Sequence, residues 1–469
     1  MKQSRHKIAF LILFFLLLSL PALTMNHKAN QVSAIDNRKL TDWSDYRGNT
    51  AEWLSSYVDD RIGGRESMIL GYLLLNDHLF HELDHPLYTY GKEGHVFFKM
   101  HPNRTYTAYH DHFVDFVDGL RKYCQDRGIP FYFQFEPEKI STYRKYLPAG
   151  VNYQDRWVST FLNKLRDRGI SVVDNWSLLA EKAKAGEPVF NVKFNAGHWN
   201  DFGAYYGMNR LFRTMHSDFP AVNPLPMDFF KQESHVETTL PDMYFPIHES
   251  IPDLDLKEPF ENLTEAYSKE VKINSHFPYF HLFRNQAQGA EVLPKVLIFQ
   301  GSYLNSWNQF LIANTRESIG VHDYQNVLNA PYYINLFRPE AVVFELAEYT
   351  VEDYYFNEDK MIHMDFPPAM TPAQLSQKAT QKTQLLRKVQ ADPKTYLTDY
   401  TLHVSAPNLR YAYLVSDDRV YDLQKETDGT FTLSVLKDSP LNLTNLRLYC
   451  CTQSGSWIRD DQAQALFRK

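Results

Sequence analysis

The chain is poor in cysteine, with Cys124, Cys450 and Cys451 alone among 469 residues. No two of them have the CxxC spacing of a zinc site, and the densest histidine pair, His110 and His112, would point to different faces of a helix. Adjacent cysteines bridge to each other only with strain, so one disulfide to Cys124 is the most that we expect. These shortages exclude a fold stapled by disulfides, and we expect neither a metal nor a cofactor.

The chain also lacks an excess of basic residues. Its 49 Lys and Arg are outnumbered by 56 Asp and Glu, its formal net charge is -7, and no long basic stripe lies outside the extreme N-terminus. Binding along nucleic-acid phosphates depends on clustered positive charge. We therefore expect no nucleic-acid partner.

Long apolar runs are missing except at the N-terminus, where one extends from Ile8 to about Met25. Its length of about 18 residues lies between that of a signal peptide and that of a short spanning helix. Three basic residues precede it: Lys2, Arg5 and Lys7. This charge favours a cytoplasmic amino end. We expect residues 1–40 to form a single-pass membrane anchor and polar tether with the body extracytoplasmic; cleavage near the small residues 32–34, which would release a secreted body, is the alternative.

Short buried strands alternate with helices over residues 41–365. The expected strands lie at residues 129–135, 170–173, 296–299 and 341–344, and the expected helices lie at residues 43–80, 108–127 and 152–168. Gly128 and Gly169 stop the second and third of these helices. Such alternation predicts a mainly parallel sheet flanked by helices, with an active site at the carboxyl ends of its strands.

The remaining segments have other characters. Residues 217–290 are rich in Pro, Asp, Phe and Glu with little periodicity, which is typical of an insertion or lid. Residues 366–397 read as a Pro-rich link followed by a helix. Residues 398–469 contain short alternating runs separated by turn residues, which predicts a small β-rich domain. This domain either binds carbohydrate or covers a sheet edge.

A serine follows one of the expected buried strands. The strand at 296–299 leads into Gly301 and Ser302, so the serine hydroxyl should lie at the carboxyl edge of the sheet. The backbone N–H of Ser302 and the side chain of Asn305 are candidate donors to an oxyanion. Taken by itself, a Gly-Ser pair can equally form a turn or cap a helix.

A histidine lies in a glycine-containing turn before another expected helix. His198 precedes a helix that should begin near Asp201. A neutral imidazole at this position can accept a serine proton and pass it to a leaving group. The alternative for a lone histidine is a structural role, packed on Trp199.

Six segments in this order resemble the alginate O-acetyltransferase family (AlgJ/AlgX-like), a branch of the SGNH hydrolases that is related to the DltD-like cell-wall acylation proteins. They are the acidic, Arg-containing residues 59–65, the Gly-Lys-Glu-Gly turn and strand at 91–98, the Pro-x-Lys to Leu-Pro segment at 137–148, the His-Trp-Asn-x-x-Gly-Ala sequence at 198–204, the Gly-Ser-Tyr turn at 301–303 and the Arg-Pro-Glu-Ala-Val strand at 338–345. The resemblance covers roughly residues 45–355, and it places His before Ser as the family does.

This resemblance implies an SGNH-like α/β domain that transfers acyl groups, commonly acetyl, to an exported or cell-surface polysaccharide, or acts as an esterase. An acyl-serine on Ser302 would form with His198 as general base and with Asn195 or Asp201 orienting the imidazole. The remaining candidates for oxyanion or substrate contacts are Gly301, Tyr303, Asn305 and Trp199. The family usually works with a membrane-embedded acyltransferase that supplies the acyl group.

Two positions depart from the family pattern. The family has an Asp two residues before the histidine, and DltD-like proteins have one three residues before it; here these positions are Ala196 and Asn195. The Asp that usually precedes the serine is Gly301. Asparagine can orient an imidazole but does not stabilise imidazolium by charge, a loss on the order of 10⁴ in rate in serine proteases. The alternative function is therefore a catalytically degenerate polysaccharide-binding or scaffold protein of a cell-envelope biosynthesis complex.

Overall fold

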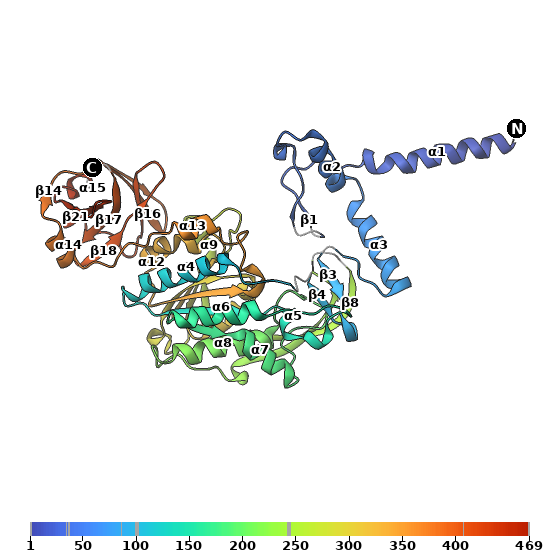
Figure 1. Ribbon diagram of the computed structural model, residues 1–469, viewed down its shortest axis with the longest axis horizontal. Helices are drawn as coiled ribbons and strands as arrows, with labels where there is room; N and C mark the ends of the chain where they lie inside the picture. The colour runs from blue at the N-terminus through green and yellow to red at the C-terminus, as the bar shows by residue number, and fades with distance from the viewer. Residues whose placement is uncertain are drawn as a thin grey trace.

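The computed structural model describes residues 2–33, 35, 38–85, 87–98, 103–241, 245–406 and 408–467. Ala34 of the cleavage-like segment lies outside them. Three parts follow one another along the chain: an N-terminal arm, an α/β body and a β-rich C-terminal unit (Figure 1).

Within the described residues, seven strands form the sheet of the body in the order β6-β5-β13-β11-β12-β10-β9. Their bounds are β5 Phe131–Glu136, β6 Ser171–Asp174, β9 Phe260–Asn262, β10 Phe280–Asn285, β11 Lys295–Gln300, β12 Glu317–His322 and β13 Ala341–Ala347. The first five strands in the order are parallel, whereas β10 and β9 are antiparallel at one edge. The prediction of a mainly parallel sheet is confirmed.

Helices cover both faces of this sheet (Figure 1). Alternate residues of β11 enter different cores, since side chains alternate across a strand. Leu297 and Phe299 pack with α4 (Ala108–Gln125), α6 (Arg156–Asp167) and α12 (Ala330–Phe337). Val296 and Ile298 pack with α7 (Asn175–Lys184), α8 (Asp201–Met215) and α11 (Asn308–Ala313). Burial on both faces explains why the central strands read as continuous apolar runs.

The segment at 217–290 is more regular than the sequence predicted. It contains a long hairpin of β7 (Phe230–Thr239) and β8 (Pro246–Leu256), the short helix α9 (Thr264–Ser268), and strands β9 and β10 of the main sheet. Most residues of β7 and β9 are exposed or half-buried. Because edge strands bury little on either face, they carry no clear apolar alternation, and the sequence pattern missed them.

The C-terminal unit begins earlier than expected. A helix was expected at the end of the link, but α14 covers only Pro372–Lys378, and strands β14 (Gln381–Lys382) and β15 (Leu386–Pro393) follow it. The unit contains a five-stranded sheet, β14-β22-β21-β17-β18, and a four-stranded sheet, β15-β16-β20-β19. The other bounds are β16 Leu397–Val404, β17 Leu409–Ser416, β18 Arg419–Asp422, β19 Gln424–Lys425, β20 Phe431–Leu436, β21 Leu446–Thr452 and β22 Trp457–Asp460. The three cysteines are free and buried.

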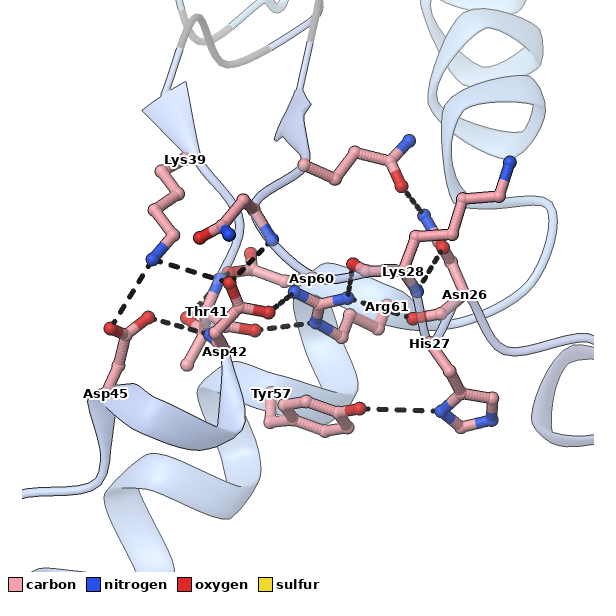
Figure 2. A network of polar contacts seen from close by, with 12 residues as sticks. Asn26, His27, Lys28, Lys39, Thr41, Asp42, Asp45, Tyr57, Asp60 and Arg61 are labelled. Atoms are coloured by element: carbon pink, nitrogen blue, oxygen red, sulfur yellow. Dashed lines mark hydrogen bonds and ion pairs between the residues drawn. The ribbon is translucent and has the colours of Figure 1, made fainter.

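The N-terminal arm consists of α1 (Lys2–Leu23), α2 (Thr50–Arg61) and α3 (Arg65–Phe80), so the helix expected over residues 43–80 is broken. The break falls at Gly64, which has a φ of 74°, a value that suits glycine. The expected tether is folded: Val32 and Ser33 pair with Lys39 and Arg38. Figure 2 shows the polar contacts that hold this segment to the end of α2. An apolar segment of α1, His6–Leu23, is long enough to cross a membrane.

An ion pair between a buried aspartate and a half-buried arginine joins the C-terminal unit to the body. Asp422 of β18 pairs with Arg127 at 2.5 Å and accepts a hydrogen bond from the Tyr123 hydroxyl at 2.6 Å. Both partners lie at the C-terminal end of α4, far from β3 (Tyr88–Tyr90) and β4 (Val96–Phe98) at the other end of the body (Figure 1). The C-terminal unit is therefore attached at the end of the body remote from β3 and β4.

Removing this carboxylate should destabilise the protein strongly. We expect Asp422→Ala to lower the free energy of unfolding by about 3 kcal/mol, because the buried Tyr123 hydroxyl and the half-buried Arg127 would both lose their partner. Urea denaturation measures the loss. The matched control is Asp418→Ala, which removes an exposed carboxylate from the turn before the same strand. Equal midpoints for the two variants would contradict the interpretation.

Candidate active site

Ser302 lies where the sequence predicted it, just beyond the carboxyl end of β11. Gly301 leaves the strand, and Ser302 begins the short helix α10 (Ser302–Asn305). A Cβ on Gly301 would lie 3.5 Å from Glu345 Oε2 and 3.7 Å from Asp323 Oδ2. An aspartate here would bring a third carboxyl group toward two that are already buried, which accounts for the glycine.

His198 reaches the serine from the loop before α8. Its Nε2 lies 2.7 Å from Ser302 Oγ, and its Nδ1 lies 2.7 Å from Asn195 Oδ1. Because an amide oxygen only accepts, Nδ1 carries the proton and Nε2 is free to accept the serine hydroxyl. The structure thus brings together three of the predicted residues: Ser302, His198 and Asn195.

The loop that carries His198 has an unusual backbone conformation. Asn195 has a φ of 48°, in the left-handed region, which asparagine tolerates better than most residues. Its backbone carbonyl also accepts the N–H of His198 at 3.1 Å. These features turn the Asn195 side chain back toward the imidazole.

The electrostatic setting of His198 favours the neutral ring. Burial lowers the pKa of His198 to about 4. Its ordinary pKa is about 6.5, and the recorded partner of Nδ1 is an amide rather than a carboxylate. The base form is therefore available from about pH 5 upward, although such a ring is a weak base.

Tyr349 is a residue of the site that the sequence did not identify. Its hydroxyl lies 2.8 Å from Ser302 Oγ, and it directly follows Glu348, just beyond the carboxyl end of β13. Burial raises the pKa of Tyr349, so the phenol stays protonated and can donate. The resemblance at residues 338–345 was the available signal, since that strand delivers the next residues to the same sheet edge. Ser302 Oγ thus lies between a histidine acceptor and a tyrosine donor.

Asp201 is placed away from the imidazole. Its carboxylate accepts the indole N–H of Trp307 and the backbone N–H of Leu254, each at 2.7 Å. The Trp307 ring lies beside His198, with centroids 6.3 Å apart. Burial raises the pKa of Asp201 to about 6. Of the two orienting candidates, Asn195 contacts the imidazole and Asp201 holds the tryptophan next to it.

The other sequence candidates have structural contacts. The Trp199 indole N–H donates to the carbonyl of Tyr303 at 2.8 Å, and the Tyr303 hydroxyl donates to the carbonyl of Pro137 at 2.7 Å. The side-chain oxygen of Asn305 accepts from Gln300 at 3.1 Å. The Trp199 contact joins the histidine loop to the serine turn, the Tyr303 hydroxyl ties that turn to the segment after β5, and Asn305 bonds to the end of β11.

A cavity of about 360 Å³ opens above the serine. Ser302, His198 and Asn195 form part of its wall, together with the buried Lys139 and with His322. Much of the remaining lining is aromatic, from Tyr88, Phe97, Phe98, Phe277, Tyr324, Tyr349, Tyr354 and Tyr355. The reactive hydroxyl therefore faces a concave site with flat apolar walls.

Buried carboxyl groups lie behind the serine turn. Glu345 accepts the backbone N–H of Gly301 at 2.6 Å, and burial, with Glu136 and Asp323 nearby, raises its pKa well above the usual range. Glu348 accepts hydrogen bonds from Ser141 and Tyr153, and burial raises its pKa to about 8. Glu345 was not identified from the sequence, because a glutamate inside a buried strand gives no sign of its partner.

The solved structures that match this chain include three of low sequence identity. PatB1 of Bacillus cereus is 12% identical with a TM-score of 0.45, covering 58% of this chain and 98% of that one. The O-acetyltransferase domain of Pseudomonas putida AlgJ is 15% identical with a TM-score of 0.40, covering 59% and 98%. Pseudomonas aeruginosa AlgX is 13% identical with a TM-score of 0.38, covering 76% and 88%.

No family model and no curated protein matches the chain. AlgJ and AlgX bear the names of the family that the sequence motifs resemble. All three TM-scores are below 0.5, so the matches carry no argument about activity. The activity proposed below rests on the sequence motifs and on the geometry around Ser302.

The missing carboxylate can be tested by restoring it. We expect Asn195→Asp to raise the pKa of His198 from about 4, because a carboxylate next to Nδ1 stabilises imidazolium. Titration of ¹⁵N-labelled histidine by NMR measures the change. Asn223→Asp adds the same charge at an exposed position and serves as the control. A pKa that moves equally in both variants would contradict the Asn195–His198 contact.

Proposed function

We propose that the chain is an extracytoplasmic O-acyltransferase or esterase that acts on a cell-surface or exported polysaccharide through an acyl-serine on Ser302. The observation that carries the proposal is the 2.7 Å contact between Ser302 Oγ and His198 Nε2 at the wall of an open cavity. Because the motifs resemble those of the AlgJ/AlgX-like family, we expect the transferred group to be acetyl and the acceptor to be a polysaccharide.

The proposed reaction has two halves. In the first, Ser302 Oγ bonds to the acyl carbon of the donor while His198 Nε2 takes the serine proton; His198 then gives that proton to the leaving oxygen, and the acyl-serine remains. In the second, an acceptor hydroxyl attacks the acyl carbon, gives its proton to His198, and the proton returns to Ser302 Oγ. Water in place of the sugar hydroxyl makes the same site an esterase.

Tyr349 is the proposed electrophilic partner. Its hydroxyl is protonated and lies within hydrogen-bonding distance of Ser302 Oγ. When Oγ bonds to the acyl carbon, the carbonyl oxygen develops negative charge within reach of the same hydroxyl. A hydrogen-bond donor that stabilises charge formed only in the transition state raises kcat.

The aromatic lining supports a sugar acceptor. Tyr354 and Tyr355 from the segment after β13, and Phe97 and Phe98 from β4, line the cavity. Flat apolar rings suit the C–H faces of a pyranose, while the tyrosine hydroxyls can bond to its hydroxyl groups.

The proposal includes a membrane anchor and a partner. The apolar segment His6–Leu23 would remain as a single-pass anchor, with a cleaved signal peptide as the alternative. As in the family that the motifs resemble, a membrane-embedded acyltransferase would deliver the acyl group to the extracytoplasmic side.

One observation favours a second candidate. His198 contacts an amide instead of a carboxylate, so the imidazolium that forms during the reaction has no neighbouring counter-charge. A catalytically degenerate protein that binds polysaccharide, or that scaffolds a biosynthetic complex, needs the aromatic cavity but not the proton transfer.

Loss of the nucleophile separates the two candidates. We expect Ser302→Ala to abolish release of product from a chromogenic acetyl ester and to abolish the acetylated Ser302 peptide detected by mass spectrometry. Ser306→Ala removes an exposed hydroxyl four residues away and should behave as wild type. Equal turnover by wild type and Ser302→Ala would exclude Ser302 as nucleophile. Glycan binding that survives without any turnover would favour the scaffold.

The tyrosine donor should act on kcat. We expect Tyr349→Phe to lower kcat by about 10²–10³-fold with little change in KM, because the hydroxyl is needed where charge develops. Steady-state kinetics on the same ester measures both constants. Tyr354→Phe, at an exposed cavity residue, is the matched control. A change confined to KM would mean that Tyr349 only binds substrate.

A further inference from the structure

The end of α1 is joined closely to the start of α3. The N–H of Gly63 donates to the carbonyl of Pro21 at 2.8 Å, and the N–H of Asn26 donates to the carbonyl of Arg61 at 2.8 Å. A Cβ on Gly63 would lie 1.9 Å from Thr24 Oγ1, so only glycine allows this approach. The helix proposed as an anchor therefore meets the following helices at a folded junction.

A buried arginine fixes this junction (Figure 2). The Arg61 side chain is 1% exposed. It pairs with Asp42 and donates to the carbonyls of Thr41 at 2.6 Å and Lys28 at 2.7 Å. A buried guanidinium is stable only when such acceptors surround it, so these contacts must hold together. They bind the segment after α1 to the C-terminal end of α2, which sets the direction of α1 relative to α3.

One face of α3 packs on the body next to the cavity. Ile69, Leu70 and Leu73 contribute to an apolar cluster that also contains Tyr88 and Ala196. Both Tyr88 and Ala196 line the cavity above Ser302. This inner face thus lies one layer of side chains from the candidate active site.

The opposite face of α3 is an exposed apolar stripe. Met68, Tyr72, Leu75 and Leu79 follow one another at spacings of four, three and four residues, which places them on one side of the helix. Each of these side chains is between 51% and 57% exposed. The outer face of a helix on a water-soluble protein is normally polar. An exposed apolar stripe of this kind is typical of a face that packs against another surface.

The position of α3 indicates what covers the stripe. The helix begins directly after the junction with α1, and in Figure 1 it runs across the direction of α1 rather than along it. If α1 spans the membrane as proposed, a helix that runs across its extracytoplasmic end lies along the membrane surface. Trp43, Trp53 and Tyr57 form an aromatic cluster in the same arm, with centroids 4.7–5.5 Å apart, and such side chains are typical of membrane interfaces.

We propose that the outer stripe of α3 inserts into the headgroup region of the lipid bilayer that holds α1. Interfacial helices bury an apolar face about 5–10 Å into the boundary between headgroups and acyl chains. Through its inner face, α3 then holds the cavity above Ser302 beside the membrane. This inference rests on the proposed anchoring by α1.

Spin labels on the full-length protein test the proposal. Leu75→Cys and Leu79→Cys each place a nitroxide on the stripe, and Val292→Cys places one on the body at a site that is 67% exposed. The three native cysteines are buried and should not react. In liposomes of phosphatidylethanolamine and phosphatidylglycerol, power saturation compares collisions with oxygen, which concentrates in lipid, and with a water-soluble nickel chelate.

We expect the ratio of the collision rate with oxygen to the collision rate with the nickel chelate to be several-fold higher at positions 75 and 79 than at position 292. Ratios equal to that at position 292, in protein that floats with the liposomes, would overturn the lipid contact while leaving the anchor intact. Protein that does not float with the liposomes would contradict the anchor itself. Labels shielded from both reagents in native membrane vesicles would show that a protein covers the stripe, and would also overturn the proposal.

Discussion

The indole N–H of Trp199, donated to the carbonyl of Tyr303 over 2.8 Å, is the contact on which the candidate site depends. Each of these buried residues directly follows one of the reactive residues, His198 and Ser302. The contact therefore aligns two loops that are separated by about a hundred residues of chain. Helix α8 makes room for the indole, because a Cβ on Gly203 would lie 2.7 Å from Trp199 Cβ and one on Gly207 2.5 Å from the Trp199 ring.

The chemistry around Ser302 is arranged without a full charge in contact with it. Burial favours the neutral form of His198 and keeps Tyr349 protonated. The residue that orients His198, Asn195, is an uncharged amide. Behind the serine turn, burial and neighbouring carboxyl groups also favour the neutral form of Glu345. Burying neutral groups costs little free energy. The imidazolium and the oxyanion that form during the reaction must then be stabilised mainly by hydrogen bonds and by their attraction to each other. This balance is compatible with slow turnover and explains why a binding role is the alternative.

The two ends of the body make different contacts. At one end, the C-terminal unit is held by the Asp422–Arg127 ion pair, and none of its described residues lines the cavity above Ser302. At the other end, α3 separates that cavity from the stripe that we assign to the membrane surface. In the proposed function, an acyl group delivered at the membrane and a polymer arriving from outside would meet in the cavity above Ser302.

Local pattern determined much of the body by itself. Strands β5, β11 and β13 were predictable because burial on both faces makes them continuous apolar runs, and α4 and α6 end where Gly128 and Gly169 take positive φ values. The sequence also pointed to Ser302 and His198, because a reactive residue at a strand end or in a turn before a helix is visible in the order of residues. Asn195 was named only through the resemblance, since it occupies the position where DltD-like proteins have an Asp.

Tertiary structure decided what depends on distant partners. Strand β12 escaped prediction because Gly320 interrupts its apolar run, and that glycine is required by the His281 ring, which would lie 2.0 Å from a Cβ. The choice between Asn195 and Asp201, and the presence of Tyr349 at the serine, follow from the directions of side chains. Those directions are set by packing between segments far apart in the chain, which no local pattern of residues records.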